Sequence, residues 1–387
     1  PVESVTSNAG MLSGDGRLDR SPHVRAFLHW MSQTRPAQWA KRIRLRIAQR
    51  KPVNWLARRK VLELIPLLVA VLALQLIFRF GLPYLWWDGY SFFHWWPGIS
   101  SFWEQDNQID IMQQISINAI MAFGMTLTIL IGGIDLSVGA VQALVGTITV
   151  TILVGSQQPN GAGLALGLAV GLGTAVVIGL FNGLCAAKTK MPPFIITLGS
   201  MLIAQGAARR FNEGQPIRVP DPATIFWHVG NGRLLGIPIP VLIMLGIFLL
   251  AALLLHRTRF GQHIYAMGGN REAARFTGIP LVRVEVLVYV ICALLAGVAG
   301  VIQTSQLYTA VPASGQGFEL TAIAAAVVGG TSFTGGKGTI IGTLIGAVII
   351  GILNKGLNQA GVHFSYQYIV KGAVILSAVY LDVRRRR

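Results

Sequence analysis

Uncharged side chains that can hydrogen-bond occur inside otherwise apolar stretches of this 387-residue sequence. Such amides and hydroxyls can hold a neutral polar solute without binding it too tightly for release. Each can instead bond to a neighbouring helix, which is a common use of these side chains in membranes. The candidates for lining a solute path are Asn118, Thr126, Asn182, Gln205 and Gln303.

Ionisable groups are scarce in the same stretches, where Arg79, Asp135 and Lys371 lie within or beside apolar runs. A carrier driven by protons or sodium ions needs acidic side chains at mid-membrane depth, and no such series is present. Asp135 directly precedes an apolar run, so it either caps a helix or serves function, and both readings stay open.

Motifs of nucleotide and metal chemistry are missing from the sequence. No Gly-rich phosphate loop of the P-loop type is found, so we do not expect the chain to bind ATP that way. Cys185 and Cys292 lie inside apolar runs and show no metal-ligand spacing. We expect no catalytic residue, no bound cofactor, no metal site and no enzymatic activity, and any uphill transport must draw its energy from a partner.

The polar loop at residues 257–283 carries the signal of a short helix. Asn270 is a good N-cap, residues 271–276 favour a helix, and Gly278 can end it. Such a helix would present Glu272 and Arg275 to a soluble protein. These residues alone leave two roles open, a docking site for a partner and a simple connection.

The composition indicates which elements must position these groups. Hydrophobic residues make up 53% of the chain and charged residues 12%, whereas a soluble domain carries roughly 25% charged residues. Most of the apolar runs reach the ~17–25 residues that a membrane-spanning helix needs. We predict an all-α integral membrane protein of about ten transmembrane helices, at residues 61–80, 110–131, 138–156, 161–187, 193–208, 237–255, 284–304, 319–333, 339–354 and 366–382.

Two of these runs, 319–333 and 339–354, are short and rich in glycine. Helices interrupted by glycine occur where a transport path crosses a membrane protein. Small residues also let two unbroken helices pack closely. The sequence is compatible with both readings.

The distribution of Lys and Arg predicts the orientation. If the chain crosses the membrane ten times, 21 of the Lys and Arg residues near the spans lie on one side of the membrane and five on the other. Because positive charge collects on the cytoplasmic side, we expect both termini to be cytoplasmic. The net charge of +17 does not indicate nucleic-acid binding, since no recognition motif accompanies it.

The first 60 residues form a basic tail, and the last four residues, 384–387, are all arginine. The tail lacks the early apolar stretch of a cleavable signal. Residues 1–36 have the composition of a disordered segment. Apolar residues at four-residue spacing within 37–51 fit a basic amphipathic helix on anionic lipid, or alternatively a solvated linker.

Four segments give the chain a resemblance to the permease subunits of bacterial ABC importers for ribose, xylose, galactose and related sugars. The resemblance runs from about residue 61 to residue 383 and leaves the tail uncovered. The segments occur in the order and at the depth that this family has. They are Gly132–Gly139 (GGIDLSVG), Pro193–Gly199 (PFIITLG), the loop Gly261–Ile279, and Gly329–Gly336 (GGTSFTGG).

The resemblance implies a homodimer of permeases in the bacterial inner membrane, enclosing one path for a neutral sugar. It further implies an ABC ATPase subunit that binds ATP and Mg on the cytoplasmic side, and a periplasmic sugar-binding protein outside. The coupling helix would lie in the loop at 257–283, with Gly269, Asn270, Glu272, Ala273, Ala274, Arg275 and Gly278 in contact with the ATPase. A stand-alone secondary transporter or a channel is the alternative. The sequence does not identify the sugar.

Overall fold

The computed structural model describes residues 52–80, 83–84, 94–95, 102, 104–189 and 191–384. The chain divides into two units, Pro1–Glu63 and Leu64–Arg387, and the second holds nearly all of the described residues. The surface helix predicted at 37–51, nearly all of the basic tail, and Arg385 to Arg387 lie outside the described residues.

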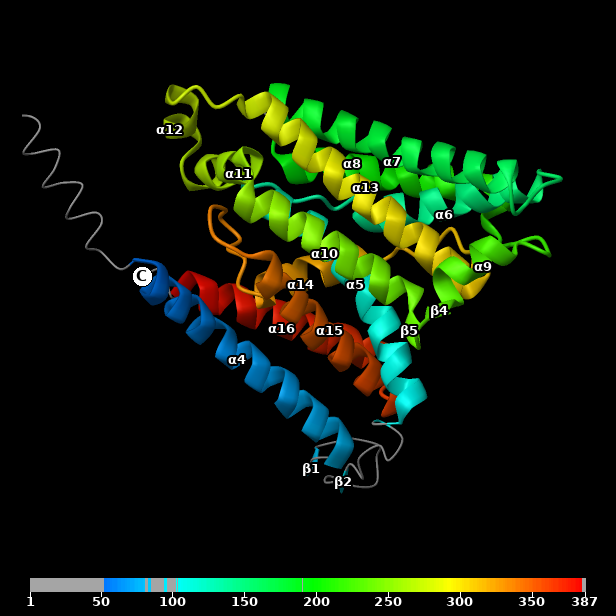
Figure 1. Ribbon diagram of the computed structural model, residues 1–387, viewed down its shortest axis with the longest axis horizontal. Coiled ribbons are helices and arrows are strands. Elements are labelled where there is room, and N and C mark those ends of the chain that lie inside the picture. Colours follow the sequence, from blue (N-terminus) through cyan, green and yellow to red (C-terminus); the bar gives the residue numbers. More distant parts are fainter. Residues whose placement is uncertain are drawn as a thin grey trace, which may run out of the picture. The chain divides into compact units, whose positions relative to one another are not determined.

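Each apolar run predicted to cross a membrane contains a helix (Figure 1). By length and composition, α5, α7, α10, α13 and α15 can span a bilayer. The ten helices are α4 (Pro52–Phe80), α5 (Gln105–Leu130), α6 (Val138–Val154), α7 (Ala162–Lys188), α8 (Pro193–Arg210), α10 (Ile239–Arg257), α13 (Leu281–Leu307), α14 (Phe318–Val328), α15 (Ile340–Gln359) and α16 (Phe364–Arg384).

Shorter elements connect these helices. They include a helical turn η2 (Phe211–Gly214) and the helices α9 (Thr224–Asn231), α11 (Arg259–Gly269) and α12 (Arg271–Phe276). Three antiparallel strand pairs join β1 (Pro83–Tyr84) to β2 (His94–Trp95), β3 (Ile217–Arg218) to β6 (Thr309–Ala310), and β4 (Arg233–Leu234) to β5 (Ile237–Pro238). Among the short helices in the part of the chain that the structure describes, α12 is the one that the sequence predicts.

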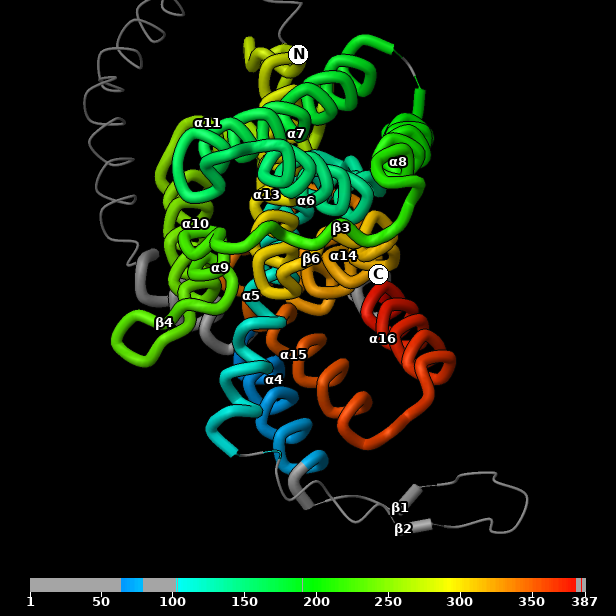
Figure 2. Tube along the Cα trace, turned by 90° about the vertical axis from the view of Figure 1, so that its right-hand side faces the viewer, coloured from blue at the N-terminus to red at the C-terminus, as the bar shows by residue number. Residues whose placement is uncertain are grey.

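Helix α5 forms the centre of the second unit. Every residue from Ile115 to Leu130 is buried, and the helix contacts α10, α13, α14 and α15. On one side α13 packs along α7 and α6, while on the other α15 packs against α14 (Figures 1 and 2). The buried apolar side chains of the neighbouring helices thus pack around α5.

Helix α14 is shorter than the predicted run at 319–333. It has 11 residues, about 16 Å at the α-helical rise, or half the thickness of a bilayer core. It ends at Val328 because Gly330 has a φ of +89°, and the amides of Gly330 and Thr331 turn back to the carbonyls of Val327 and Ala326. The helix is therefore interrupted by glycine.

The glycines of this region also let α14 and α15 pack closely. A Cβ added to Gly346 on α15 would collide with the carbonyl oxygen of Ala325 on α14. Each sequence interpretation therefore fits one of the two helices. Helix α14 is interrupted by glycine, whereas α15 is continuous over 20 residues and uses its glycines to pack closely against α14.

The end of α11 makes a similar contact with the end of α5. Gly268 lies against Leu130, so a Cβ at this position would collide with the Leu130 carbonyl oxygen. That oxygen also accepts a hydrogen bond of 2.9 Å from the amide of Gly336, in the loop after α14. Three segments distant in the sequence meet here through their backbones.

Replacing Gly268 with Ala should destabilise the protein, because the added methyl forces these backbones apart. Overpacking of this kind costs about 1–3 kcal/mol. Gly269→Ala is the matched control, since nothing lies within 4 Å of a Cβ at that neighbouring position. Thermal unfolding of the two purified variants in detergent measures the effect. Equal unfolding temperatures would show that the contact at Leu130 is not tight.

Candidate functional site

Helix α12 is fixed at both ends by hydrogen bonds, as the sequence predicts. Asn270 is its N-cap, and its side-chain Oδ1 accepts from the amide of Ala273 at 2.9 Å. At the other end Gly278 has a φ of +80°, and the amides of Gly278 and Ile279 donate to the carbonyls of Arg275 and Ala274. This pattern fixes a short helix that would be unstable alone.

An ion pair ties α12 to the long helix α13. Both terminal nitrogens of Arg271 donate to the carboxylate of Glu285, one of them at 3.3 Å. Glu285 is 2% exposed, so its charge requires a partner, and a two-pronged guanidinium contact is the strong form of that pairing. A force applied to α12 therefore reaches α13 through a bond as well as through the chain.

The outer face of α12 is exposed. Ala274 is buried, whereas Gly269, Glu272, Ala273 and Arg275 are exposed. Phe276 is 88% exposed, and sequence reasoning did not single it out. An exposed aromatic ring beside charged residues is the composition of a protein-binding surface.

The turn between α5 and α6, residues 131–137, holds two buried polar side chains, Asp135 and Ser137. Asp135 Oδ1 accepts from the amide and the hydroxyl of Ser137 at 2.9 and 2.5 Å. Helix α6 begins at Val138, but Ser137 already has helical φ and ψ and makes no cap bond of its own. A side-chain oxygen that accepts from the amide two residues on makes the bond of an N-cap, so the structure supports the capping role of Asp135. Burial raises the pKa of the Asp135 carboxyl to about 6, although hydrogen bonds from Ser137 and Asn182 counteract part of that rise.

Three of the five candidate path residues make interhelical hydrogen bonds. Thr126 shares a bond of 2.6 Å with Thr343, and Gln303 accepts from Gln142 at 2.6 Å. Asn182 donates to Ser137 Oγ at 3.0 Å and accepts from Ser200 at 2.5 Å. Gln205 is half-buried on α8. The structure brings none of these four together with Asn118.

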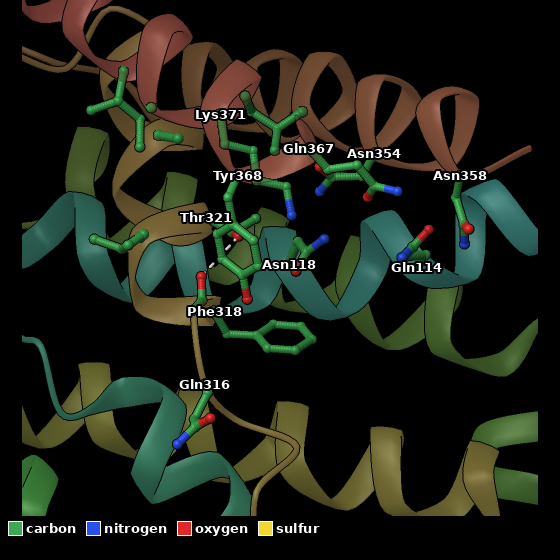
Figure 3. A pocket seen from close by; sticks show the side chains of 16 residues that line it. Gln114, Asn118, Gln316, Phe318, Thr321, Asn354, Asn358, Gln367, Tyr368 and Lys371 are labelled. Atoms are coloured by element: carbon green, nitrogen blue, oxygen red, sulfur yellow. Dashed lines mark hydrogen bonds between the residues drawn. The ribbon is translucent and has the colours of Figure 1, made fainter. Parts of the chain in front are cut away.

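Asn118 instead lines a cavity of about 280 Å³ between α5, α14, α15 and α16 (Figure 3). Sequence reasoning missed the other polar residues around it, although a signal was present. They recur at four-residue spacing on three apolar helices and therefore share a face. The pairs are Gln114 with Asn118, Asn354 with Asn358, and Gln367 with Lys371.

Helices long enough to cross a membrane, a polar cavity among the helices and a short exposed helix fixed at both ends are together typical of a membrane transport protein. The chain belongs to the family described as the permease component of branched-chain amino acid transport systems, whose model matches residues 107–379.

The chain is similar to several curated permeases. It is 46% identical to the ribose import permease protein of Escherichia coli K12 over 291 residues, which are 74% of this chain and 88% of the relative. The ribose import permease protein of Bacillus subtilis is 45% identical over 74% of this chain and 87% of its own length. The D-allose transport system permease protein of Escherichia coli K12 is 38% identical over 72% and 83%. No solved structure matches the chain.

Asp135→Asn should stabilise the protein at high pH, because it keeps an oxygen for Ser137 and removes a buried charge. The folded-state pKa of about 6 exceeds the ordinary 3.8, so the folded protein binds the extra proton and stability falls as pH rises through this window. Above pH 6 the cost of a shift of about two units is roughly 3 kcal/mol.

Thermal unfolding of the wild type and Asp135→Asn at pH 4.5 and pH 8 checks this. We expect a clear gain for the variant at pH 8 and a small difference at pH 4.5. The same difference at both pH values would contradict the account of the buried carboxyl.

Proposed function

We propose that this chain is the permease subunit of an ATP-driven importer that passes a neutral sugar into the cytoplasm by alternating access. The sugar is a pentose, a hexose or a related polyol, delivered by a periplasmic binding protein. Similarity to permeases named for ribose, allose and arabinose supports this proposal. A stand-alone carrier or channel is disfavoured, because these relatives are named as an import permease and as permeases of transport systems.

The polar cavity favours a sugar over a branched-chain amino acid. An amino acid is a zwitterion, and a buried ammonium group needs an opposite charge such as a carboxylate to pair with. The 16 lining residues, all within the described chain, include amides, a phenol and one lysine but no carboxylate. This lining suits hydroxyl groups better than a free ammonium group.

The exposed, doubly fixed α12 is the observation that carries the coupling role. An ABC ATPase subunit docks on Glu272, Arg275 and Phe276, and the Arg271–Glu285 pair transmits its motion to α13. ATP and Mg belong to that subunit. The residues from Gly269 to Gly278 supply the contact surface and the helix ends that keep it rigid.

The proposed topology has ten spans in the bacterial inner membrane, with both termini cytoplasmic. The charge asymmetry of the loops supports it. Helix α14 then crosses only part of the bilayer, buried among its neighbours, where an irregular backbone is tolerated. A reporter fused after Arg387 and a tag beside Arg271 should both be cytoplasmic, and opposite locations for these two would contradict the map.

Two copies of the permease form the proposed importer, and the basic tail contacts anionic lipid. The homodimer follows from the family architecture that the sequence resembles. The tail, with 13 of the chain's 32 Lys and Arg residues, is suited to the negatively charged cytoplasmic leaflet.

Reversing the charge of Glu272 should uncouple the importer. Glu272→Arg places a second positive charge beside Arg275 and reverses the charge that Glu272 presents to the ATPase, so a favourable contact across that interface would become a like-charge contact. We expect both sugar uptake and sugar-stimulated ATP hydrolysis to fall at least about tenfold in liposomes that contain permease, ATPase and binding protein. Glu213→Arg, the same reversal at an exposed residue outside this loop, is the control.

Gly278 supplies a second test of the same role. Gly278→Val forces a β-branched residue into a left-handed conformation, whereas Gly278→Asn tolerates it. The valine variant should lose both activities, and the asparagine variant should keep most of them. Wild-type rates in both Glu272→Arg and Gly278→Val would rule out the coupling assignment.

A further inference from the structure

The cavity between α5, α14, α15 and α16 contains buried hydrogen-bonding atoms without partners. The side-chain oxygens of Asn118 and Asn354 have no hydrogen-bond donor within reach in the described chain. Asn118 is 3% exposed and Asn354 is 8% exposed. Leaving such a group unsatisfied costs about 1–3 kcal/mol, and native proteins rarely tolerate that cost without a reason.

A donor faces the same cavity from the opposite wall. Lys371 and Tyr368 reach from α16 toward Asn118 on α5, and Asn354 lies beside Gln367 (Figure 3). The Lys371 ammonium lies 5.5 Å from the centre of the Tyr368 ring, a cation–π contact that leaves hydrogens free to donate. Lys371 is the one charged side chain in this lining.

Part of the wall is apolar. Phe318, Leu320 and Ala324 on α14, Ile350 on α15 and Ile375 on α16 supply it, and the amides of Gln114, Gln316 and Asn358 also line the cavity. Thr321 donates to the carbonyl of Gly317 at 3.0 Å, so its hydroxyl hydrogen is already used. The cavity therefore combines unpaired acceptors and a pure donor with surfaces for C–H groups.

A hydroxyl group is both a donor and an acceptor, so a polyol satisfies both walls at once. Its hydroxyl hydrogens can bond to the amide oxygens, its oxygens can accept from the ammonium, and its C–H face can lie on the apolar wall. A cation would be repelled by Lys371, and an apolar solute would leave the amides unpaired.

We propose that this cavity is a transit site in which a neutral sugar donates to Asn118 and Asn354 and accepts from Lys371. The inference rests on the proposed import of a neutral sugar and adds the residues that recognise it inside the membrane domain. Lys371 also disfavours cationic solutes in this cavity, because its ammonium group repels them.

The test measures the number of sugar molecules imported per ATP hydrolysed. Liposomes carry the full-length permease with its ATPase, and saturating binding protein presents D-ribose, D-allose or L-arabinose, whichever the wild type imports fastest. A merely structural defect lowers uptake and ATP hydrolysis together. Loss of the transit site lowers uptake while the binding protein still stimulates hydrolysis, so the ratio falls.

The variants separate hydrogen bonding from volume. Asn354→Leu removes the acceptor at similar size, Asn354→Asp keeps oxygen acceptors, and Lys371→Met removes the donor. Loss of one hydrogen bond of about 1 kcal/mol predicts a ratio about fivefold lower for Leu and Met, and Asp should lie closer to the wild type. Asn354→Ala replaces the leucine variant if that protein does not fold.

Lys355→Met is the matched control, because Lys355 lies next to Asn354 on α15 but pairs with Asp110 at 3.3 Å, outside the cavity. A wild type that imports neither these three sugars nor any other pentose, hexose or polyol that its binding protein retains would overturn the proposed function, and the transit site with it. A wild type that imports sugar, with Asn354→Leu and Lys371→Met giving the same ratio as Lys355→Met, would overturn the transit site alone.

Discussion

The backbone N–H and C=O groups of the turn between α5 and α6 must find hydrogen-bond partners within the protein, because the turn is not part of a helix or sheet. In a membrane domain such a segment persists only where the protein supplies its hydrogen bonds. Thr197 on α8 accepts from the amide of Leu136 and donates to the carbonyl of Ile134, both at 3.1 Å. Asp135 accepts from Ser137, which in turn accepts from Asn182 on α7. These bonds hold α7 and α8 against the turn.

The same requirement joins the proposed coupling segment, residues 269–278, to the membrane helices. The last carbonyl of α5, at Leu130, accepts from Gly336, and Gly268 at the end of α11 lies against it. All four segments that carry the family resemblance therefore belong to one connected structure around this turn. Because packed interiors transmit strain, a push on α12 reaches α5 through α11, and reaches α13 through the Arg271–Glu285 pair.

Elements defined by local pattern could be predicted from the sequence, whereas contacts between distant segments could not. The helices follow from apolar runs, and α12 follows from Asn270 and Gly278, because hydropathy and capping are local properties. The end of α14 at Val328 was missed, since glycine fits both a packed helix and a broken one. Asp135 was expected as a cap or a functional group, and the structure shows the capping bond that its carboxylate accepts from the amide of Ser137.

The candidate path shows the same limit. Of five polar residues chosen singly, Asn118 alone lines the cavity, because a side chain's partner depends on which helix lies opposite. Residues paired at four-residue spacing would have been the better signal. Such pairs mark a polar face along a whole helix, and Asn354–Asn358 and Gln367–Lys371 both show it.

Because the loop after α14 lies against Gly268 and Gly269, we expect it to move with α12 as one body. Spin labels at Thr277, which follows α12 outside the proposed ATPase contact, and at Lys337, both exposed, report this directly by pulsed electron resonance. In the labelled permease both native cysteines are replaced. It is mixed with an excess of unlabelled permease and assembled with the proposed ATPase and binding protein. We predict one narrow distance distribution, the same without nucleotide and with ATP and vanadate. A shift or a second population on adding ATP and vanadate would contradict the account, because the coupling segment would then move independently of the membrane helices.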